Sequence, residues 1–360
     1  RKYTVDSSSI LLTNPTRTGY RFMGWFNNSY VIGDPTQVIP QGSYGDIDLY
    51  AKWEKEYVFK FYNSAKIEIA SNITYGIYNE IIQLPECDPG FNWDGLNPLS
   101  SYTVHGDRQF YLRSIPLSEM YNYEGDYYEV WNYDQLREMY KFPSCNFKIM
   151  TSIYVPSGAA PWMPIESFTG VIDGNNQIIS GLEFSHIKSN IGFINSNKGT
   201  IKNLRITDVE ININTNSGMS GNISVGVIAV VNEESGIISN CNVGYMRIYS
   251  EAHITSNFQA NIGAVCGSNQ GTIQSTYVIY FGASAYGVLG GLVGTNSGNI
   301  MESGIGSSNL DIYWGEVGGI AGVNGGTIFD CEITTTCISC YNGFPYDSYY
   351  ENQVKYVIAG

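Results

Sequence analysis

Five segments in the C-terminal half of the chain repeat one pattern: an apolar strand, a corner of Asn, Ser and Gly, and a second strand. The glycine two residues before a recurring Ile stands at positions 199, 236, 271, 298 and 326, so successive copies are 37, 35, 27 and 28 residues apart. A period of this size is typical of a solenoid. One copy cannot bury its apolar face without neighbours on both sides, so the copies are predicted to stack. The corner glycines should supply a positive φ or room for a close backbone approach. The copies occupy residues 191–204, 225–241, 262–273, 290–300 and 317–328.

The residue three positions after the recurring Ile tests this stacking, because an interior position must be small or apolar. It is Leu204, Cys241, Thr276, Ser303 and Cys331 in the five copies. Stacked strands lie roughly 4.8 Å apart, whereas a disulfide requires Cα atoms within about 7 Å of each other. Cys241 and Cys331 are three copies apart and cannot be bridged. We predict that both are buried thiols.

The composition favours strands and argues against several classes of function. The chain has 19 Lys and Arg against 33 Asp and Glu, a formal net charge of -14, and no basic run, which disfavours nucleic acid as a partner. Gly (40) and Tyr (29) are abundant, as expected for strands joined by tight turns. The longest apolar stretch, residues 225–231, is too short to cross a bilayer, so we expect no membrane insertion. No signal segment precedes Arg1, and we expect a mature or trimmed fragment.

The first 54 residues contain two short apolar runs between Gly and Pro punctuation. Residues 14–26 precede a turn-rich stretch, and residues 45–53 follow it. Alternating apolar residues in both runs predict paired strands with a small core. The expected core residues are Tyr20, Phe22, Trp25, Leu49 and Trp53.

Gly-Tyr-Arg-Phe-Met-Gly-Trp at residues 19–25 and Leu-Tyr-Ala-Lys-Trp at residues 49–53 resemble the marks of the internalin-type B repeat, or Listeria–Bacteroides repeat. The resemblance implies a small β-grasp module, found in arrays on secreted and cell-surface proteins. Only residues 1–5 remain for the family's opening strand, so we expect the full-length protein to continue upstream.

Residues 55–115 repeat this plan in degenerate form. Residues 57–61 supply an opening strand, residues 89–93 stand where the first copy has Gly-Tyr-Arg-Phe, and residues 106–112 mirror residues 45–51. We interpret the segment as a divergent second repeat module.

A short helix is predicted next, near residues 132–140. Asn132 can cap it and Pro143 stops it. Such an element would cover the open end of the stacked copies, which otherwise exposes unpaired backbone.

The stacked copies resemble GLUG motifs, whose Gly-Leu-any-Gly core is present as Gly291-Leu292-Val293-Gly294. The segments 162–165, 168–176 and 178–182 resemble the lead-in to such repeats in large bacterial surface proteins. The copy at residues 225–241 matches worst, since it lacks the second glycine. The resemblance covers residues 128–340 and implies a right-handed parallel β-helix. Some relatives are IgA-protease-like enzymes, and others are adhesins.

The predicted fold is therefore mostly β: two small β-grasp-like modules, then a right-handed parallel β-helix with a short N-terminal capping helix. The expected domains are residues 1–54, 55–115 and 116–345, with residues 346–360 as a C-terminal strand or the start of a further module. The aromatic-rich residues 341–350 suggest a cap, or alternatively a surface or donated strand for a partner subunit.

Carboxylates on one exposed face are what a polysaccharide-cleaving β-helix would need. The candidates are Asp173, Asp208, Glu210, Asp330 and Glu332. Asp173 belongs to an Asp-Gly-Asn turn, where bonding to nearby amides is the favoured role. Asp208 and Glu210 share one strand face, but no matching pair occurs at that site in adjacent copies.

No other pattern in the sequence indicates chemistry. No metalloprotease helix, nucleophile elbow, P-loop or dinucleotide motif is present. His105, His186 and His253 lack metal-ligand spacing, and no calcium loop occurs. Cys337 and Cys340 have redox or metal spacing, but buried small residues or a local disulfide are favoured. We predict no catalytic, cofactor-binding or metal-binding residues, no cofactor and no enzyme activity.

The sequence thus favours an extracellular structural or adhesive scaffold, either a cell-surface adhesin or a subunit of a filament. Its partners would be protein or glycan ligands on a surface, or further copies of itself. The alternative is a non-catalytic region of a large secreted peptidase of the IgA-protease type, or of a carbohydrate-active β-helix enzyme.

Overall fold

The computed structural model describes residues 2–94, 101–184, 189–214, 222–251 and 260–340. Within these ranges the chain is mostly strand, with one α-helix and three short 3-10 helices, so the predicted fold class is confirmed at that level. The chain divides into two compact units, an N-terminal unit Arg1–Ile115 and a C-terminal unit Pro116–Gly360. Residues 346–360, for which a further strand or module was predicted, lie outside the described residues.

The N-terminal unit begins with the predicted pair of strands. β2 (Tyr20–Phe26) runs antiparallel to the first half of β4 (Tyr50–Tyr62), and β1 (Ile10–Leu11) pairs with β3 (Val38–Ile39). Phe22 packs edge-on to Trp25, with ring centroids 5.5 Å apart, and lies 5.3 Å from Trp53. The predicted core is only half-buried, and Tyr20 is 37 % exposed, with the Arg17 guanidinium over its ring. Among residues 2–54 only Phe26 is buried, because so small a sheet has no second layer to cover it.

The rest of the N-terminal unit contains a similar antiparallel pair of strands. β7 (Phe91–Trp93) is antiparallel to β9 (Arg108–Ser114), and β9 is parallel to the second half of β4. β5 (Thr74–Ile77) pairs with β4 on the side away from β9. β6 (Ile81–Gln83) pairs with β8 (Ser101–Thr103), and the 3-10 helix η1 spans Ala70–Asn72. The closing strand of the first module and the opening strand of the second are one continuous strand, β4. The core here is Phe59, Phe61, Ile82, Leu84, Trp93, Val104 and Phe110.

The C-terminal unit starts with η2 (Leu117–Glu119), β10 (Tyr121–Asn122) and β11 (Tyr127–Val130). The predicted helix follows as α1 (Tyr133–Glu138), continued by η3 (Met139–Lys141). As predicted, the Asn132 side chain caps it, accepting a hydrogen bond from the Gln135 amide at 3.0 Å. Leu136 and Met139 are fully buried in the same apolar cluster as the strands that follow.

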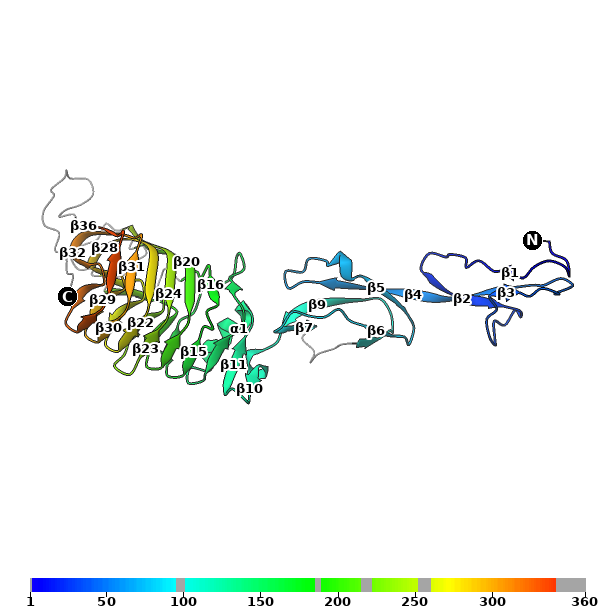
Figure 1. The fold of residues 1–360 in the computed structure, drawn as a ribbon, viewed down its shortest axis with the longest axis horizontal. Helices are drawn as coiled ribbons and strands as arrows, with labels where there is room; N and C mark the ends of the chain where they lie inside the picture. Colours follow the sequence, from blue (N-terminus) through cyan, green and yellow to red (C-terminus); the bar gives the residue numbers. More distant parts are fainter. Residues whose placement is uncertain (1, 95–100, 185–188, 215–221, 252–259, 341–360) are drawn as a thin grey trace. The chain divides into compact units, whose positions relative to one another are not determined.

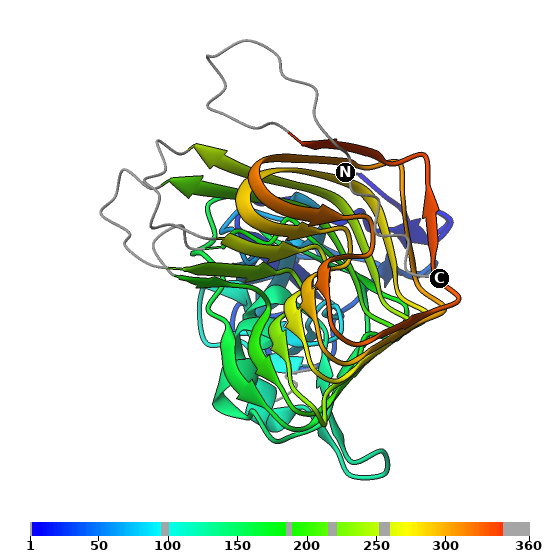
Figure 2. The same cartoon turned by 90° about the vertical axis from the view of Figure 1, so that its left-hand side faces the viewer.

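Three sheets make up the rest of this unit, and apart from β10 their strands pair in parallel (Figures 1 and 2). The six-stranded sheet contains β14 (Ile165–Phe168), β18 (Ile194–Asn197), β22 (Ala229–Asn232), β26 (Cys266–Asn269), β29 (Val293–Asn296) and β33 (Ala321–Asn324). The nine-stranded sheet contains β10, β11, β12 (Phe147–Ile149), β15 (Val171–Asp173), β19 (Thr200–Lys202), β23 (Ile237–Ser239), β27 (Thr272–Gln274), β30 (Asn299–Met301) and β34 (Thr327–Phe329).

The twelve-stranded sheet forms the remaining sides of each turn. It contains β13 (Ile153–Tyr154), β16 (Ile178–Ser180), β17 (Asn190–Ile191), β20 (Arg205–Asn214), β21 (Ile223–Gly226), β24 (Asn242–Glu251), β25 (Ala260–Gly263), β28 (Tyr277–Gly290), β31 (Gly304–Gly306), β32 (Asn309–Gly318), β35 (Glu332–Thr334) and β36 (Cys337–Cys340). β28 is long enough to pair with β24 through its first half and with β25 through its second. In the two preceding turns the same path is split into β20 with β21 and β24 with β25, so the longer steps of 37 and 35 residues arise at these interruptions.

Each predicted copy therefore places its two strands in two different parallel sheets, joined at a corner, and successive copies stack in register. The corner glycines have ordinary φ angles, and their role is close approach. A Cβ on Gly298 would lie 2.2 Å from the Gly271 carbonyl oxygen, and one on Gly271 would lie 2.2 Å from that of Gly236. The positive φ values fall instead on the next corner, at Asn203, Asn240, Ser275, Glu302 and Asp330.

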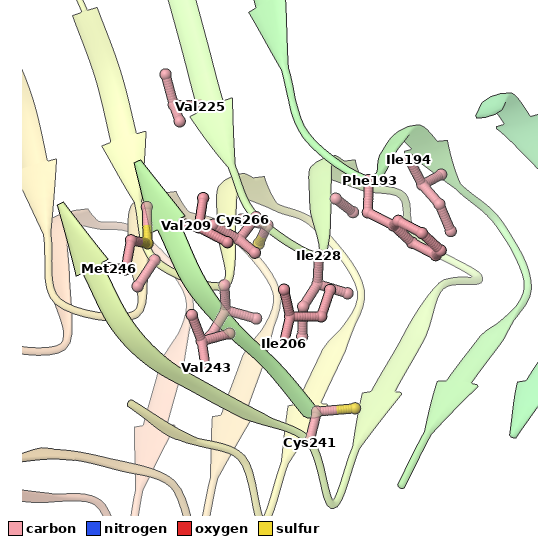
Figure 3. Packing of buried hydrophobic residues seen from close by; sticks show 14 of the residues in the cluster. Phe193, Ile194, Ile206, Val209, Val225, Ile228, Cys241, Val243, Met246 and Cys266 are labelled. Atoms are coloured by element: carbon pink, nitrogen blue, oxygen red, sulfur yellow. The ribbon is translucent and has the colours of Figure 1, made fainter. Parts of the chain in front are cut away.

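Buried apolar side chains fill the space between the three sheets as one cluster (Figure 3). The predicted interior positions Leu204, Cys241, Thr276 and Ser303 are buried, at 2 % exposure or less. Cys331 is only half-buried, which corrects that prediction: it follows β34, and no described strand stacks on β34 from the far side. All seven cysteines are free thiols, so no disulfide joins Cys241 to Cys331.

The stack also contains turns that the repeat pattern missed. β14, β15 and β16 pair in register with β18, β19 and β20, so the segment interpreted as a lead-in is itself a turn. The pattern missed it because Phe168 stands in register where later turns have asparagine. Those asparagines form an asparagine ladder, in which each side-chain amide donates to the next side-chain oxygen at 2.7–2.8 Å. Its members are Asn197, Asn232, Asn269, Asn296 and Asn324.

Candidate ligand-binding groove

A second set of residues with positive φ recurs from turn to turn, after the set at Asn203, Asn240, Ser275, Glu302 and Asp330, and bends the strands of the twelve-stranded sheet. We call it the corner column: Asp208, Tyr245, Tyr280, Ser307 and Thr335, with φ between 45° and 58°. Each residue interrupts the ladder at the same level, because the strand residues on either side remain in register from turn to turn. A positive φ in a non-glycine residue is uncommon, and five at one level mark a built corner. All five side chains are exposed to solvent.

Two tyrosines of the corner column stack on each other. The rings of Tyr245 and Tyr280 have centroids 4.8 Å apart and an interplanar angle of 24°, while 61 % and 49 % of these residues remain exposed. Their separation equals the spacing of neighbouring parallel strands, because each ring stands on its own turn. The stack therefore runs along the column and offers a ring face at each end.

A groove of about 790 Å³ follows this column. It is lined by Asp208, Tyr245, Arg247, Tyr280, Phe281, Gly282, Ser307, Ser308, Asn309 and Thr335. On the far side of Tyr280 the column continues with short side chains, and the hydroxyl oxygens of Ser307 and Thr335 lie 3.2 Å apart. The groove thus combines an aromatic face with hydroxyl, amide and guanidinium groups, a mixture that can bind a ligand having both an apolar face and polar edges.

The five carboxylates proposed from the sequence have different surroundings. Of the five, Asp208 lines the groove, and it accepts hydrogen bonds from the hydroxyls of Ser180 at 2.6 Å and Thr207 at 2.9 Å. Glu210 is exposed two residues later on β20, as expected from the shared face. Asp330 and Glu332 flank Cys331 on the last described turn.

Asp173 has the turn role that was predicted for it. Its carboxylate accepts hydrogen bonds from the Asn175 amide at 2.8 Å and from the Asn203 side chain at 2.9 Å, and Lys202 lies 3.6 Å away. Partial burial acts to raise the pKa of Asp173, but these hydrogen bonds and the nearby Lys202 outweigh it and hold the pKa below its ordinary value. Asp173 therefore stabilises the corner between two strands.

The cysteines and histidines in the part of the chain that the structure describes differ in burial and in surroundings. Burial raises the pKa of the Cys241 thiol to about 12 and also raises that of Cys266, so both remain protonated. The sequence favoured buried residues or a local disulfide at Cys337 and Cys340, but Cys337 is exposed, Cys340 is half-buried and both are free thiols. They lie three residues apart in strand β36, where such residues point to opposite faces. His105 packs edge-on to Tyr78 and Tyr102, while His186 and His253 lie outside the described residues. Within the described ranges, His, Cys, Asp and Glu do not gather into a group of three or more that could hold a metal ion.

Sequence reasoning missed the corner column. A signal was present, because each of its members stands four residues after an interior position of the copies, for example Tyr245 after Cys241 and Tyr280 after Thr276. The residue type at this position varies from copy to copy, so no repeated side-chain chemistry marks the position in the sequence.

Comparison with known proteins identifies the start of the chain. Residues 1–52 match the family model for the Listeria-Bacteroides repeat domain. The Listeria-Bacteroides repeat is a cell-surface type of domain, and the resemblance noted in the sequence is confirmed to that extent. None of the described helices is long and apolar enough to cross a membrane.

The chain as a whole has weaker relations. No curated protein matches it. A solved structure named IgA1 Protease is similar at 12 % identity and a TM-score of 0.39, over 82 % of this chain and 26 % of that one. The chain thus spans about a quarter of the length of that protein, and a likeness at this level carries no argument about function.

Proposed function

We propose that the chain is an extracellular, non-catalytic scaffold of a cell surface, with an adhesive role. In this proposal the C-terminal unit is a right-handed parallel β-helix of GLUG-type repeats that presents a long regular face. The N-terminal unit is a spacer of two β-grasp-like modules. The single observation that carries the proposal is the register of successive turns, whose parallel strands enclose one continuous apolar core.

Two further observations support this proposal. The Listeria-Bacteroides repeat at residues 1–52 is of a cell-surface type. The formal net charge of -14 keeps such a chain soluble and away from polyanionic partners. A regular outer surface built on a rigid core suits attachment to a ligand, or to further copies of the chain in a filament.

Location is the first test of this proposal. Antibodies against the C-terminal unit should label intact cells that produce the protein, and brief treatment of those cells with proteinase K should remove the label. Labelling that appears only after the cells are permeabilised would contradict the proposal.

Activity and assembly are the second test. The purified chain should show no turnover of casein with or without added zinc, and robust turnover would overturn the non-catalytic assignment. Electron microscopy of the native protein then separates the two scaffold roles: single particles support an adhesin, and polymers support a filament subunit.

A further inference from the structure

We propose that the groove beside the corner column binds a neutral pyranose of a glycan, with the sugar stacked on the free face of Tyr280. This inference depends on the proposed adhesive function for its biological meaning, and it names the chemistry of the ligand. The sugar would take the place of a third ring in the stack begun by Tyr245 and Tyr280.

The geometry provides a slot of the correct kind. Tyr280 belongs to β28, which has β24 with Tyr245 on one side and the turn of β31 and β32 with Ser307 on the other. One face of the Tyr280 ring is used in the stack with Tyr245. The other face borders the turn of Ser307, where the column carries a hydroxymethyl group instead of a ring. The groove extends over that turn and the next, to Thr335.

The lining suits a pyranose. One face of such a ring carries aliphatic C–H groups, which pack on the electron-rich face of an aromatic side chain. Its edge carries hydroxyl groups, and each needs a partner when it leaves water. The hydroxyls of Ser307 and Thr335 bond to each other at 3.2 Å, and the Thr335 hydroxyl also accepts a hydrogen bond from the Ser307 amide at 3.1 Å. A hydroxyl donates one hydrogen bond and accepts two, so both keep capacity for a sugar hydroxyl, and Asn309 adds an amide to the lining.

Charge and backbone pairing argue against other occupants. Asp208 and Arg247 contribute one charge of each sign to the groove, and the chain as a whole is acidic, so an anionic polymer gains little. A peptide could not add as a strand, because β28 is already paired with strands on both sides. A neutral ring with hydroxyl edges remains the best match.

Calorimetry on the full purified chain tests the proposal, with cellohexaose, chitohexaose, mannohexaose and xylohexaose as the probes. At least one hexasaccharide should bind. Tyr280→Ala should weaken that binding about tenfold or more, and Tyr280→Phe, which keeps the ring face, should restore it. Tyr277→Ala is the matched control, because Tyr277 is also an exposed tyrosine of β28 but does not line the groove, and it should bind as the unmodified chain does.

Ser307→Tyr is the sharper variant. The φ angle of Ser307, 51°, lies between those of Tyr245 and Tyr280, so the backbone there can accept a tyrosine. The new ring should stack on Tyr280 and occupy the place proposed for the sugar. It should abolish binding while circular dichroism and thermal unfolding stay unchanged. The proposal is overturned if none of the four probes binds at millimolar concentration, or if binding survives both Tyr280→Ala and Ser307→Tyr. Surface labelling of cells does not involve the groove, so the proposed function and this inference can fail separately.

Discussion

The side chain of each inner asparagine in the ladder both accepts and donates hydrogen bonds. Asn269 accepts from Asn232 at 2.8 Å, donates to Asn296 at 2.7 Å, and reaches the carbonyl oxygen of Gly271 in its own corner. A buried amide without such partners would cost free energy, whereas a column of identical amides satisfies itself. The ladder therefore favours one register between turns, because a slip of one residue would bury unpaired polar groups.

We predict that Asn269→Ala destabilises the C-terminal unit by about 1–3 kcal/mol. The substitution leaves the buried side-chain oxygen of Asn296 without the donor it now has. Urea unfolding followed by circular dichroism measures the loss. Asn299→Ala, at an exposed asparagine of the adjacent strand β30, is the control and should change stability by less than about 0.5 kcal/mol. Equal stability of the two variants would contradict a structural role for the ladder.

Cys241 makes stability depend on pH in the alkaline range. Its thiol has an ordinary pKa of 9.0, which burial raises to about 12 in the folded chain. Below pH 9 the thiol is protonated in both states. Above pH 9 the unfolded chain loses this proton first, so the free energy of unfolding should fall by up to about 1.4 kcal/mol per pH unit until about pH 12.

The check is urea unfolding at several values between pH 8.5 and 10.5. Cys241→Ala should reduce the slope of stability against pH relative to the unmodified chain, and buried Cys266, whose pKa is also raised, should account for part of the slope that remains. Val243→Ala, at a buried residue two positions further along the chain that has no titratable group, should lower stability but keep the original slope. The assignment fails if both variants have the same slope.

At the scale of elements, each turn of the C-terminal unit must bend several times, and some of these bends lie within a strand. Left-handed residues make two of these bends, at Asn240 and at Tyr245 in the second copy for example, and they leave the side chain free to point outward. The second bend is what exposes the tyrosine stack. The groove is therefore a consequence of how the strand turns its corner.

The start of α1 depends on one side chain. We predict that Asn132→Ala lowers the free energy of unfolding by about 1 kcal/mol, because the Gln135 amide loses the oxygen that it bonds at 3.0 Å. Urea unfolding of the full chain measures this. Asn132→Asp, which keeps an oxygen at the cap, should remain within about 0.5 kcal/mol of the unmodified chain. A loss as large for aspartate as for alanine would rule out capping as the cause.

At the scale of the whole molecule, the chain has two separate apolar clusters, one in each unit. We predict that a cut between Ile115 and Pro116 leaves two pieces that each unfold within about 2 °C of their transition in the intact chain, as measured by calorimetry. A cut between residues 54 and 55 is the control. It falls inside β4, which pairs with β2 on one part and with β5 and β9 on the other, so it should unfold the N-terminal unit.

Much of this architecture can be predicted from the sequence alone, because it depends on local periodicity. The spacing of the corner glycines, the interior positions such as Leu204 and Thr276, and the capped helix at Asn132 all follow from which residues tolerate a corner, a buried site or a helix start. The start of the chain follows from its family motif. These features need only neighbouring residues to agree with one another.

Only the tertiary structure could decide which role the corner residues have and which side chains come together on the outer surface. The sequence allowed the corner glycines two roles, and the close contact of Gly298 with the Gly271 carbonyl selects one of them. The turn at Phe168 lacks the asparagine signature and became visible only through its pairing. The tyrosine stack joins residues 35 positions apart, Tyr245 and Tyr280, at a site where the copies share no residue type. Such a site depends on register between turns, and register is fixed by the packing of the whole stack.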